Sequence, residues 1–226
     1  MTGLCLLERV RERPRIPELL AISARQLCGG VAGLGTWARS LPAGTAIQLR
    51  EKDLDQADLI RLGRSLRRAF DGVLIVNGDL EAAVACDADG VHLPSDAPWR
   101  ELSEGVLQRG LLLGVSTHSV AELEAASESG AHYALFGPVF DTPEKRRFGP
   151  AQGLERLRRA VKVGLPVLAV GGVDAGNASA IAHAGAHGVA AIRAFVDQRA
   201  AVDLETAWLG AAGTMRPRDA SDPQLY

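Results

Sequence analysis

The chain has 226 residues and a formal net charge of -2, and 4% of its residues are aromatic. This balance of charge excludes a general attraction to nucleic acid or to an acidic membrane surface, and so few aromatic side chains give no platform for base stacking. The length suits one large domain, and 47% hydrophobic residues are enough for a sizeable core. Any anion site must therefore come from a local arrangement of residues.

The cysteines Cys5, Cys28 and Cys86 are widely spaced and form no C-x-x-C motif, so neither a disulfide framework nor a structural zinc site is expected. The first residues make a poor signal peptide. No run of about 18 apolar residues predicts a membrane span. We therefore expect a cytoplasmic protein with no membrane or nucleic-acid partner, and the sequence leaves homo-oligomerisation open.

Short β-rich runs alternate along the chain with stretches of helical spacing. The runs that fit strands are 19–23, 45–49, 73–77, 90–93, 111–117, 133–140, 166–172 and 188–195. They are nearly continuous in apolar residues, which is typical of strands buried on both faces of a parallel sheet. Apolar residues at helical spacing fill the stretches 59–70, 120–129, 153–163 and 177–186.

Eight strands alternating with helices over this length predict a single (β/α)8 barrel, spanning residues 1–213. A doubly wound parallel sheet is the alternative, but it usually has fewer strands and a glycine-rich loop after the first strand. The stretch 26–41 is rich in glycine and predicts its helix only weakly. The polar, proline-containing residues 214–226 are expected to form a disordered tail.

Polar residues follow the expected strands, where a barrel carries its active site. In chain order the candidates are Gln48, Arg50, Lys52, Asn77, Asp79, Asp96, Ser116, His118, Thr142, Lys145, Gly171, Gly172, Ile192 and Arg193. The two glycines let backbone N–H groups approach an anion just before a helix begins. Since the loops after the last two strands of a barrel often bind phosphate, we expect a phosphate site there. Arg50, Lys52 and Lys145 could neutralise a second, more highly charged group.

Six segments in this order resemble the family of thiamine phosphate synthase and thiazole tautomerase: QLREK, the Asn-Gly after the third strand, DGVHLPSD, GVSTHS, YALFGPVFDTPEK and LAVGGV. The resemblance runs from about residue 45 to 195, and it rests on all six in register because no single motif is decisive. It implies an enzyme that joins a hydroxymethylpyrimidine pyrophosphate to a thiazole phosphate and releases pyrophosphate. In this family Mg2+ holds the leaving group, and the thiazole nitrogen is thought to capture a pyrimidine carbocation.

The resemblance also implies a role for each matching residue. The pyrimidine pyrophosphate would be bound by Gln48, Arg50, Lys52 and Ser116, with Asn77 at the pyrimidine edge. Asp96 would be a ligand of Mg2+, which prefers carboxylate oxygen. The loop closing over both substrates would contribute Thr142 and Lys145. The thiazole phosphate would be bound by Gly172, Ile192 and Arg193, next to Gly171.

Three positions depart from the synthase pattern. The family usually has Asn-Asp after the third strand, with the aspartate as the other metal ligand. Here Gly78 takes that place and Asp79 comes one residue later, so Asp79 is the candidate for the second ligand. Glu144 stands where the family often has a threonine that binds phosphate, and Arg193 stands where a serine is usual.

A thiazole tautomerase is the main alternative, because that branch typically has the Asn-Gly and Leu-Pro-Ser found here. In that branch the residue matching His118 transfers protons on a thiazole carboxylate phosphate, a task that suits an imidazole. The chain nevertheless keeps Gln48, Arg50, Lys52 and Asp96, which have little use if no pyrophosphate binds. We therefore predict a synthase, with a tautomerase or a non-catalytic phosphate-binding relative as alternatives.

Purely structural roles compete with these assignments. Asp79, Asp96 and Ser116 could each cap a helix. His118 could be an ordinary loop histidine. His92 lies inside an expected strand and is interpreted as structural.

Overall fold

The computed structural model describes residues 15–142 and 150–215. Within these ranges eight parallel strands close into a barrel in chain order, so that the first strand pairs with both the second and the eighth. The strands are β1 Leu19–Ile22, β2 Ala46–Leu49, β3 Leu74–Asn77, β4 Gly90–Leu93, β5 Leu112–Thr117, β6 Tyr133–Phe136, β7 Val167–Val170 and β8 Gly188–Ala191. The expected (β/α)8 barrel is confirmed.

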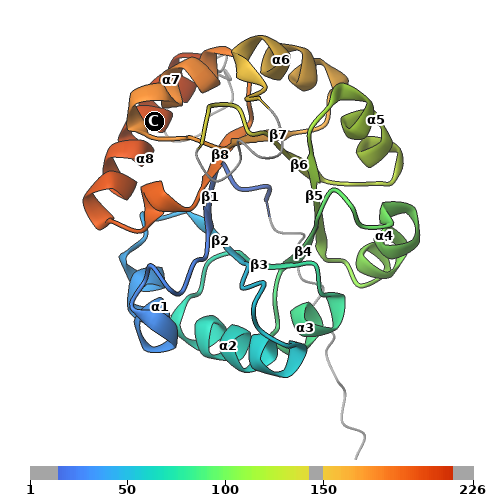
Figure 1. Ribbon diagram of the computed structural model, residues 1–226, viewed down its shortest axis with the longest axis vertical. Coiled ribbons are helices and arrows are strands. Elements are labelled where there is room, and N and C mark those ends of the chain that lie inside the picture. Colours follow the sequence, from blue (N-terminus) through green and yellow to red (C-terminus); the bar gives the residue numbers. More distant parts are fainter. Residues whose placement is uncertain (1–14, 143–149, 216–226) are drawn as a thin grey trace, which may run out of the picture.

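The helices form a ring around the strands (Figure 1). They are α1 Gly30–Ser40, α2 Gln56–Ala69, α3 Leu80–Ala85, α4 Trp99–Gln108, α5 Val120–Glu128, α6 Gly153–Ala160, α7 Ala175–His183 and α8 Gln198–Met215. Two short 3-10 helices, η2 Val161–Val163 and η3 Arg193–Phe195, follow α6 and β8. Helix α8 extends two residues past the expected boundary at 213, and residues 216–226 of the expected tail lie outside the described ranges.

Helix α1 forms although its sequence is rich in glycine. Its buried side chains are Leu34, Trp37 and Ala38. The indole Nε1 of Trp37 donates a 2.6 Å hydrogen bond to the carbonyl of Phe195, which lies 158 residues along the chain. Tertiary packing therefore stabilises this helix where local propensity does not.

The sixth and eighth strands are shorter than predicted. β6 ends at Phe136 because the next residues are Gly137 and Pro138, and proline has no N–H to continue the sheet. The N–H groups of Val139 and Phe140 instead bond to carbonyls at the end of β7. After β8 the chain turns into η3 rather than continuing the strand.

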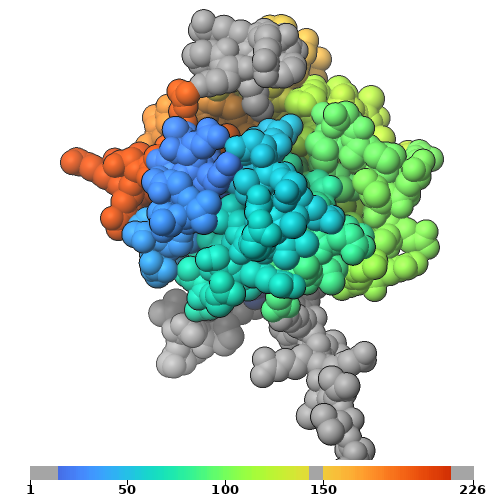
Figure 2. All heavy atoms as spheres, turned by 60° about the horizontal axis from the view of Figure 1, so that its bottom comes forward, coloured from blue at the N-terminus to red at the C-terminus, as the bar shows by residue number. Residues whose placement is uncertain are grey.

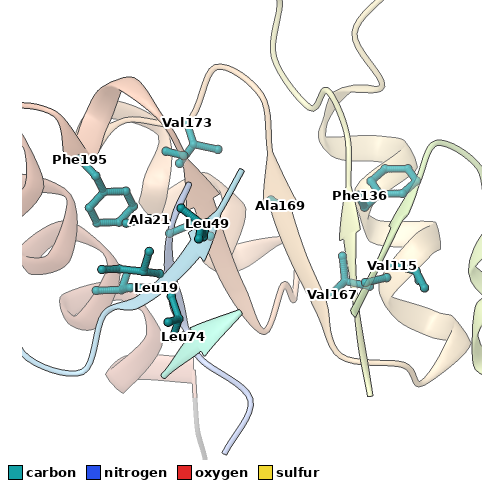
Figure 3. Close-up of a cluster of buried hydrophobic side chains, with 14 of the residues drawn as sticks. Leu19, Ala21, Leu49, Leu74, Val115, Phe136, Val167, Ala169, Val173 and Phe195 are labelled. Carbon is teal, nitrogen blue, oxygen red and sulfur yellow. The ribbon is translucent and has the colours of Figure 1, made fainter. Parts of the chain in front are cut away.

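Side chains alternate between two hydrophobic layers along each strand. The outer layer fills the space between strands and helices, and Figure 3 shows Leu19 and Leu49 of this layer beside Phe195. The inner layer fills the barrel and comprises Leu20, Ile22, Ala46, Ile75, Tyr133, Leu135, Leu168 and Ala190. A residue two places beyond an inner one also faces the interior, so the alternation aims Gln48 and Asn77 inward at the carboxyl end of the barrel.

The outer surface is built by successive βα units, which Figure 2 shows side by side from blue to green. No helix in the described ranges has the length and apolar character needed to cross a membrane.

Candidate active site

The carboxyl end of the barrel interior is lined by polar side chains. Gln48 is 1% exposed, and its amide Nε2 has no hydrogen-bond partner among the described residues. Asn77 donates through Nδ2 to the carbonyl of His92 at 3.3 Å. A buried amide nitrogen without a partner is costly, so the site offers Gln48 to a bound molecule.

Arg50 and Lys52 come directly after β2. Arg50 is half-buried, and burial lowers the pKa of its guanidinium while the nearby Glu51 carboxylate raises it. Burial and, to a smaller extent, the positive charge of Arg50 lower the pKa of His92, and Arg50 lies two residues beyond the inward-facing Gln48. Lys52 is exposed. A half-buried cation at the mouth of the barrel attracts an anion more strongly than an exposed one.

A network of four side chains holds the loop that carries Arg50. Ser23 Oγ donates to Glu51 Oε1 at 2.7 Å and accepts the backbone N–H of Arg50 at 2.9 Å. The guanidinium of Arg25 donates to Glu51 Oε2 at 2.8 Å and to both carboxylate oxygens of Asp53 at 2.6 Å. The loops after β1 and β2 are therefore tied together at the backbone of Arg50.

Ser116, His92 and Tyr133 form a hydrogen-bonded chain inside the barrel. His92 Nε2 lies 2.9 Å from Ser116 Oγ, and His92 Nδ1 lies 3.2 Å from Tyr133 Oη. Neither His92 nor Tyr133 is exposed. The proposed helix-capping role of Ser116 is wrong, because Ser119 caps α5.

His118 is held by two contacts at the start of the loop after β5. Its Nδ1 lies 2.5 Å from the carbonyl oxygen of Gly137, and its backbone N–H donates to Glu122 at 2.7 Å. Because a carbonyl only accepts, Nδ1 carries the proton, and in the neutral ring Nε2 presents a lone pair. The histidine is thus oriented rather than loose.

The two candidate metal ligands differ in their surroundings. Asp79 caps α3 by accepting from the N–H of Ala82 at 2.7 Å, and it also accepts from the Gln56 amide at 3.0 Å. The structural role considered for Asp79 is therefore confirmed. Asp96 is exposed, and α4 has no side-chain cap, so the capping role considered for Asp96 is wrong.

Gly171 and Gly172 form a tight turn between β7 and α7. Both have positive φ, 94° and 68°, a conformation that favours glycine. A Cβ on Gly172 would lie 2.7 Å from Cβ of Phe140, and one on Gly171 would lie 2.6 Å from Cα of Pro138. Asp174 caps α7 just after this turn. The turn thus packs bare backbone against the loop after β6, just before the N-terminus of α7, which Asp174 caps.

The remaining candidates are Ile192, Arg193, Thr142 and Lys145, and the first three lie within the described ranges. Ile192 packs against the inner hydrophobic layer, and Arg193 begins η3 with an exposed side chain. Thr142 has a buried Oγ1 with no hydrogen-bond partner among the described residues. Glu144 and Lys145 lie outside the described ranges.

The fold and the lining residues define a (β/α)8 barrel enzyme whose rim is suited to phosphorylated ligands. A family model described as thiamine monophosphate synthase matches residues 19–195. The chain belongs to this family, which confirms the resemblance of its motifs.

Individual relatives agree with this membership. The chain is 42% identical over 168 residues to a thiamine-phosphate synthase of Methanocella arvoryzae, covering 71% of this chain and 79% of the relative. It is 36% identical over 186 residues to a thiamine-phosphate synthase of Moorella thermoacetica, covering 79% and 88%. A solved thiamine phosphate pyrophosphorylase from Pyrococcus furiosus superposes with a TM-score of 0.75 at 30% identity, covering 86% of this chain and 96% of that one.

Several residues of the site were not singled out in the sequence. Ser23, Arg25 and Glu51 support Arg50, and Tyr133 completes the chain through His92. His92 was interpreted as structural, yet it contacts the candidate residue Ser116. The alternation of side chains along β4 turns His92 toward the barrel interior. This could have indicated its role, but the inward face can be assigned only once the strand register is known.

Proposed function

We propose that the protein is a thiamine-phosphate synthase, a transferase that joins a hydroxymethylpyrimidine pyrophosphate to a thiazole phosphate and releases pyrophosphate. The observation that carries the proposal is the buried amide of Gln48, which has no hydrogen-bond partner among the described residues and lies two residues before Arg50. It stands in a chain that matches the synthase family over residues 19–195. A site that only rearranged a thiazole would have no use for these groups.

The main task of these residues is to accept the charge that the leaving pyrophosphate gains as its bond to the pyrimidine carbon breaks. Arg50, Lys52 and Lys145 supply positive charge, and Ser116 supplies a hydroxyl donor. Fixed donors and cations stabilise a departing anion because they need no reorganisation when the bond breaks. Gln48 and Asn77 would hold the pyrimidine so that the exposed carbon faces the thiazole nitrogen.

Magnesium fits this proposal as a partner of the pyrophosphate. No group of three or more His, Cys, Asp and Glu side chains in the described ranges could hold a metal ion by itself. Mg2+ commonly takes one or two carboxylates and completes its shell with water and substrate phosphates. Asp96, which is exposed and does not cap α4, would serve as the carboxylate ligand, and Asp79 would have to share its oxygens with Ala82 and Gln56. The bound ion would neutralise pyrophosphate charge.

The thiazole phosphate would occupy the opposite side of the mouth. The turn at Gly171 and Gly172 would offer backbone N–H groups just before α7, whose N-terminus is capped by Asp174. Arg193 would add a charged donor where the family usually has a serine. Ile192 would support the ring from the interior layer. Thr142, whose hydroxyl has no hydrogen-bond partner within residues 15–142 and 150–215, would donate it to one of the phosphates.

One observation favours the tautomerase as the second candidate. The bond between His118 Nδ1 and Gly137 leaves Nε2 as an oriented proton acceptor, which general base catalysis on a thiazole needs. The relatives described above are named as synthases, however. The synthase therefore remains the first proposal.

The proposed substrates are small phosphorylated molecules, and the proposed compartment is the cytoplasm. Among the described residues, Cys28 and Cys86 form no disulfide, which supports a reducing compartment. We propose no nucleic-acid or membrane partner, and sedimentation of the purified chain would decide whether it forms a homo-oligomer.

The deciding experiment incubates the purified chain with the pyrimidine pyrophosphate and the thiazole phosphate, with Mg2+ or with a chelator. Formation of thiamine phosphate and pyrophosphate only with Mg2+ is the expected result. Failure to form product under both conditions, from protein shown to be folded by circular dichroism, would refute the synthase. The thiazole carboxylate phosphate would then be assayed with the unchanged chain and with His118→Asn, since a tautomerase would lose activity in that variant.

A further inference from the structure

The chain of hydrogen bonds from Tyr133 through His92 to Ser116 connects a fully buried phenol to the mouth of the barrel. The three residues belong to β6, β4 and β5, and the two links measure 3.2 Å and 2.9 Å. The rings of His92 and Tyr133 are 5.7 Å apart, centroid to centroid. Ser116 is half-buried and is the member that reaches the site. The hydrogen-bonded series therefore ends in the buried Tyr133 on one side and in Ser116, which can contact a bound substrate, on the other.

Only one arrangement of protons satisfies every buried donor among Tyr133, His92 and Ser116. Because the bond to His92 is the one recorded for Tyr133 Oη in the described ranges, the buried O–H must donate to Nδ1 or lose its bond. In the neutral imidazole the proton then lies on Nε2, so Nε2 donates to Ser116 Oγ. Ser116 thereby accepts one hydrogen bond from beneath and keeps its own O–H for a ligand.

The opposite arrangement would disable the serine as a donor. If Nδ1 carried the proton, Nε2 would accept the hydroxyl of Ser116, and the serine would show only lone pairs to the site. Those lone pairs would repel an anion. Burial and the charge of Arg50 lower the pKa of His92 to about 3, and burial raises the pKa of Tyr133. Neither group changes its charge near neutral pH, so the direction is stable.

The backbone makes room for this arrangement. Gly114 is the register partner of both His92 and Tyr133. A Cβ on Gly114 would lie 2.1 Å from Cζ and 2.4 Å from Oη of Tyr133. Any other residue at Gly114 would displace the phenol from His92.

We propose that Tyr133 and His92 are positioning residues that orient the Ser116 hydroxyl as a hydrogen-bond donor to the pyrophosphate leaving group. This inference rests on the proposed function, since it assigns the pyrophosphate to the Ser116 side of the mouth. Neither residue touches the substrate, and both act through Ser116.

A double-mutant cycle tests the inference with Tyr133→Phe, Ser116→Ala and the combined variant. The readouts are the Kd of inorganic pyrophosphate with Mg2+, measured by calorimetry, and kcat with both substrates. Each single variant should weaken pyrophosphate binding by about tenfold or more, the scale of a hydrogen bond to a charged group. The combined variant should bind no more weakly than Ser116→Ala, because Tyr133 acts only through that hydroxyl. Losses that multiply in the combined variant would overturn the inference.

His92 gives a second test that does not depend on the phenol. His92→Gln keeps an N–H that can donate toward Ser116, whereas His92→Leu has similar size and no donor. Pyrophosphate binding should be largely retained in the glutamine variant and lost in the leucine variant. Equal losses in both, or no pyrophosphate binding by the unchanged chain, would contradict the inference. Normal pyrophosphate binding without thiamine phosphate formation would instead refute the proposed function. The double-mutant cycle would then still test whether Tyr133 and His92 orient the Ser116 hydroxyl.

Discussion

Ser23 and Glu51 are joined by a 2.7 Å hydrogen bond between two buried side chains, one following β1 and the other following β2. The same serine oxygen accepts the backbone N–H of Arg50. Glu51 in turn accepts from the backbone and the guanidinium of Arg25. The position of the Arg50 backbone therefore depends on a carboxylate that does not itself enter the barrel.

Glu51→Gln is expected to destabilise the protein and to weaken substrate binding together. Both oxygens of Glu51 accept from donors, so in either orientation the glutamine NH2 would oppose one: the Arg25 guanidinium on one side, or the backbone N–H of Arg25 on the other. A loss of about 2 kcal/mol in the free energy of unfolding is expected, measured by urea denaturation. The KM for the pyrimidine pyrophosphate should rise because Arg50 is no longer held.

Asp53→Asn is the matched control, because Asp53 pairs with the same arginine from the exposed side, where side-chain exposure is 50%. Its effect on stability should be clearly smaller. Equal effects of the two variants would contradict the special role of Glu51.

His92 should make the stability of the protein depend on pH in a defined direction. Its pKa is about 3 in the fold, against an ordinary value of 6.5. The unfolded chain therefore binds a proton below pH 6.5 that the folded chain refuses, so stability is full above pH 6.5 and falls as the pH drops toward 3. The loss at pH 5 is about 2 kcal/mol.

Urea denaturation at pH 7.5 and pH 5 measures this effect, with His92→Gln as the comparison. The variant should lose less stability between the two pH values than the unchanged chain, because glutamine does not titrate. Identical pH dependence in the two proteins would show that His92 is not the responsible group.

Asp79→Asn separates capping from metal binding at the start of α3. Asparagine caps a helix about as well as aspartate, so the thermal midpoint should change little, whereas Asp79→Ala should cost about 1 kcal/mol. If Asp79 is a ligand, the Mg2+ concentration for half-maximal activity should rise about tenfold in the asparagine variant. Asp96→Asn should raise it at least as much. An unchanged Mg2+ requirement in Asp79→Asn would leave Asp79 with a structural role alone.

Gly172→Ala should damage the proposed thiazole phosphate site. Alanine is strained at a φ of 68°, and its Cβ would press against Phe140 at 2.7 Å. The KM for the thiazole phosphate should rise more than the KM for the pyrimidine pyrophosphate. Gly164→Ala is the control, since Gly164 has a φ of 88° but open space for a Cβ. That variant should lose about 1 kcal/mol of stability and keep both KM values.

Arg50→Lys distinguishes charge from shape at the pyrophosphate. Lysine keeps the charge but loses the planar fork that binds two oxygens, so activity should fall by about tenfold, while Arg50→Ala should fall by about a hundredfold or more. Arg61→Ala, on the exposed outer surface of α2, should leave kcat unchanged. Lys145→Ala should resemble Arg50→Ala. Full activity in both Arg50 variants would remove this residue from the site.

The apolar runs by themselves determined the class of fold. Strands that are apolar on both faces and alternate with helices predict a parallel sheet packed against those helices. Eight such strands fit a closed barrel, as observed. The inventory of polar residues at the strand ends was also readable, because the carboxyl ends of parallel strands share one rim. Helix α1 was the weak point, since the contact that stabilises it joins Trp37 to Phe195 across 158 residues.

The tertiary structure alone decided which polar groups meet. Asp79 was predicted to face a metal, and the fold gives its oxygens to Ala82 and Gln56. Ser116 and His92 are 24 residues apart in the chain and form one hydrogen bond. The physical reason is the register of the closed sheet: a shift of one residue turns a side chain from the interior to the helical layer. Register is set by packing all eight strands at once, which no local segment of sequence contains.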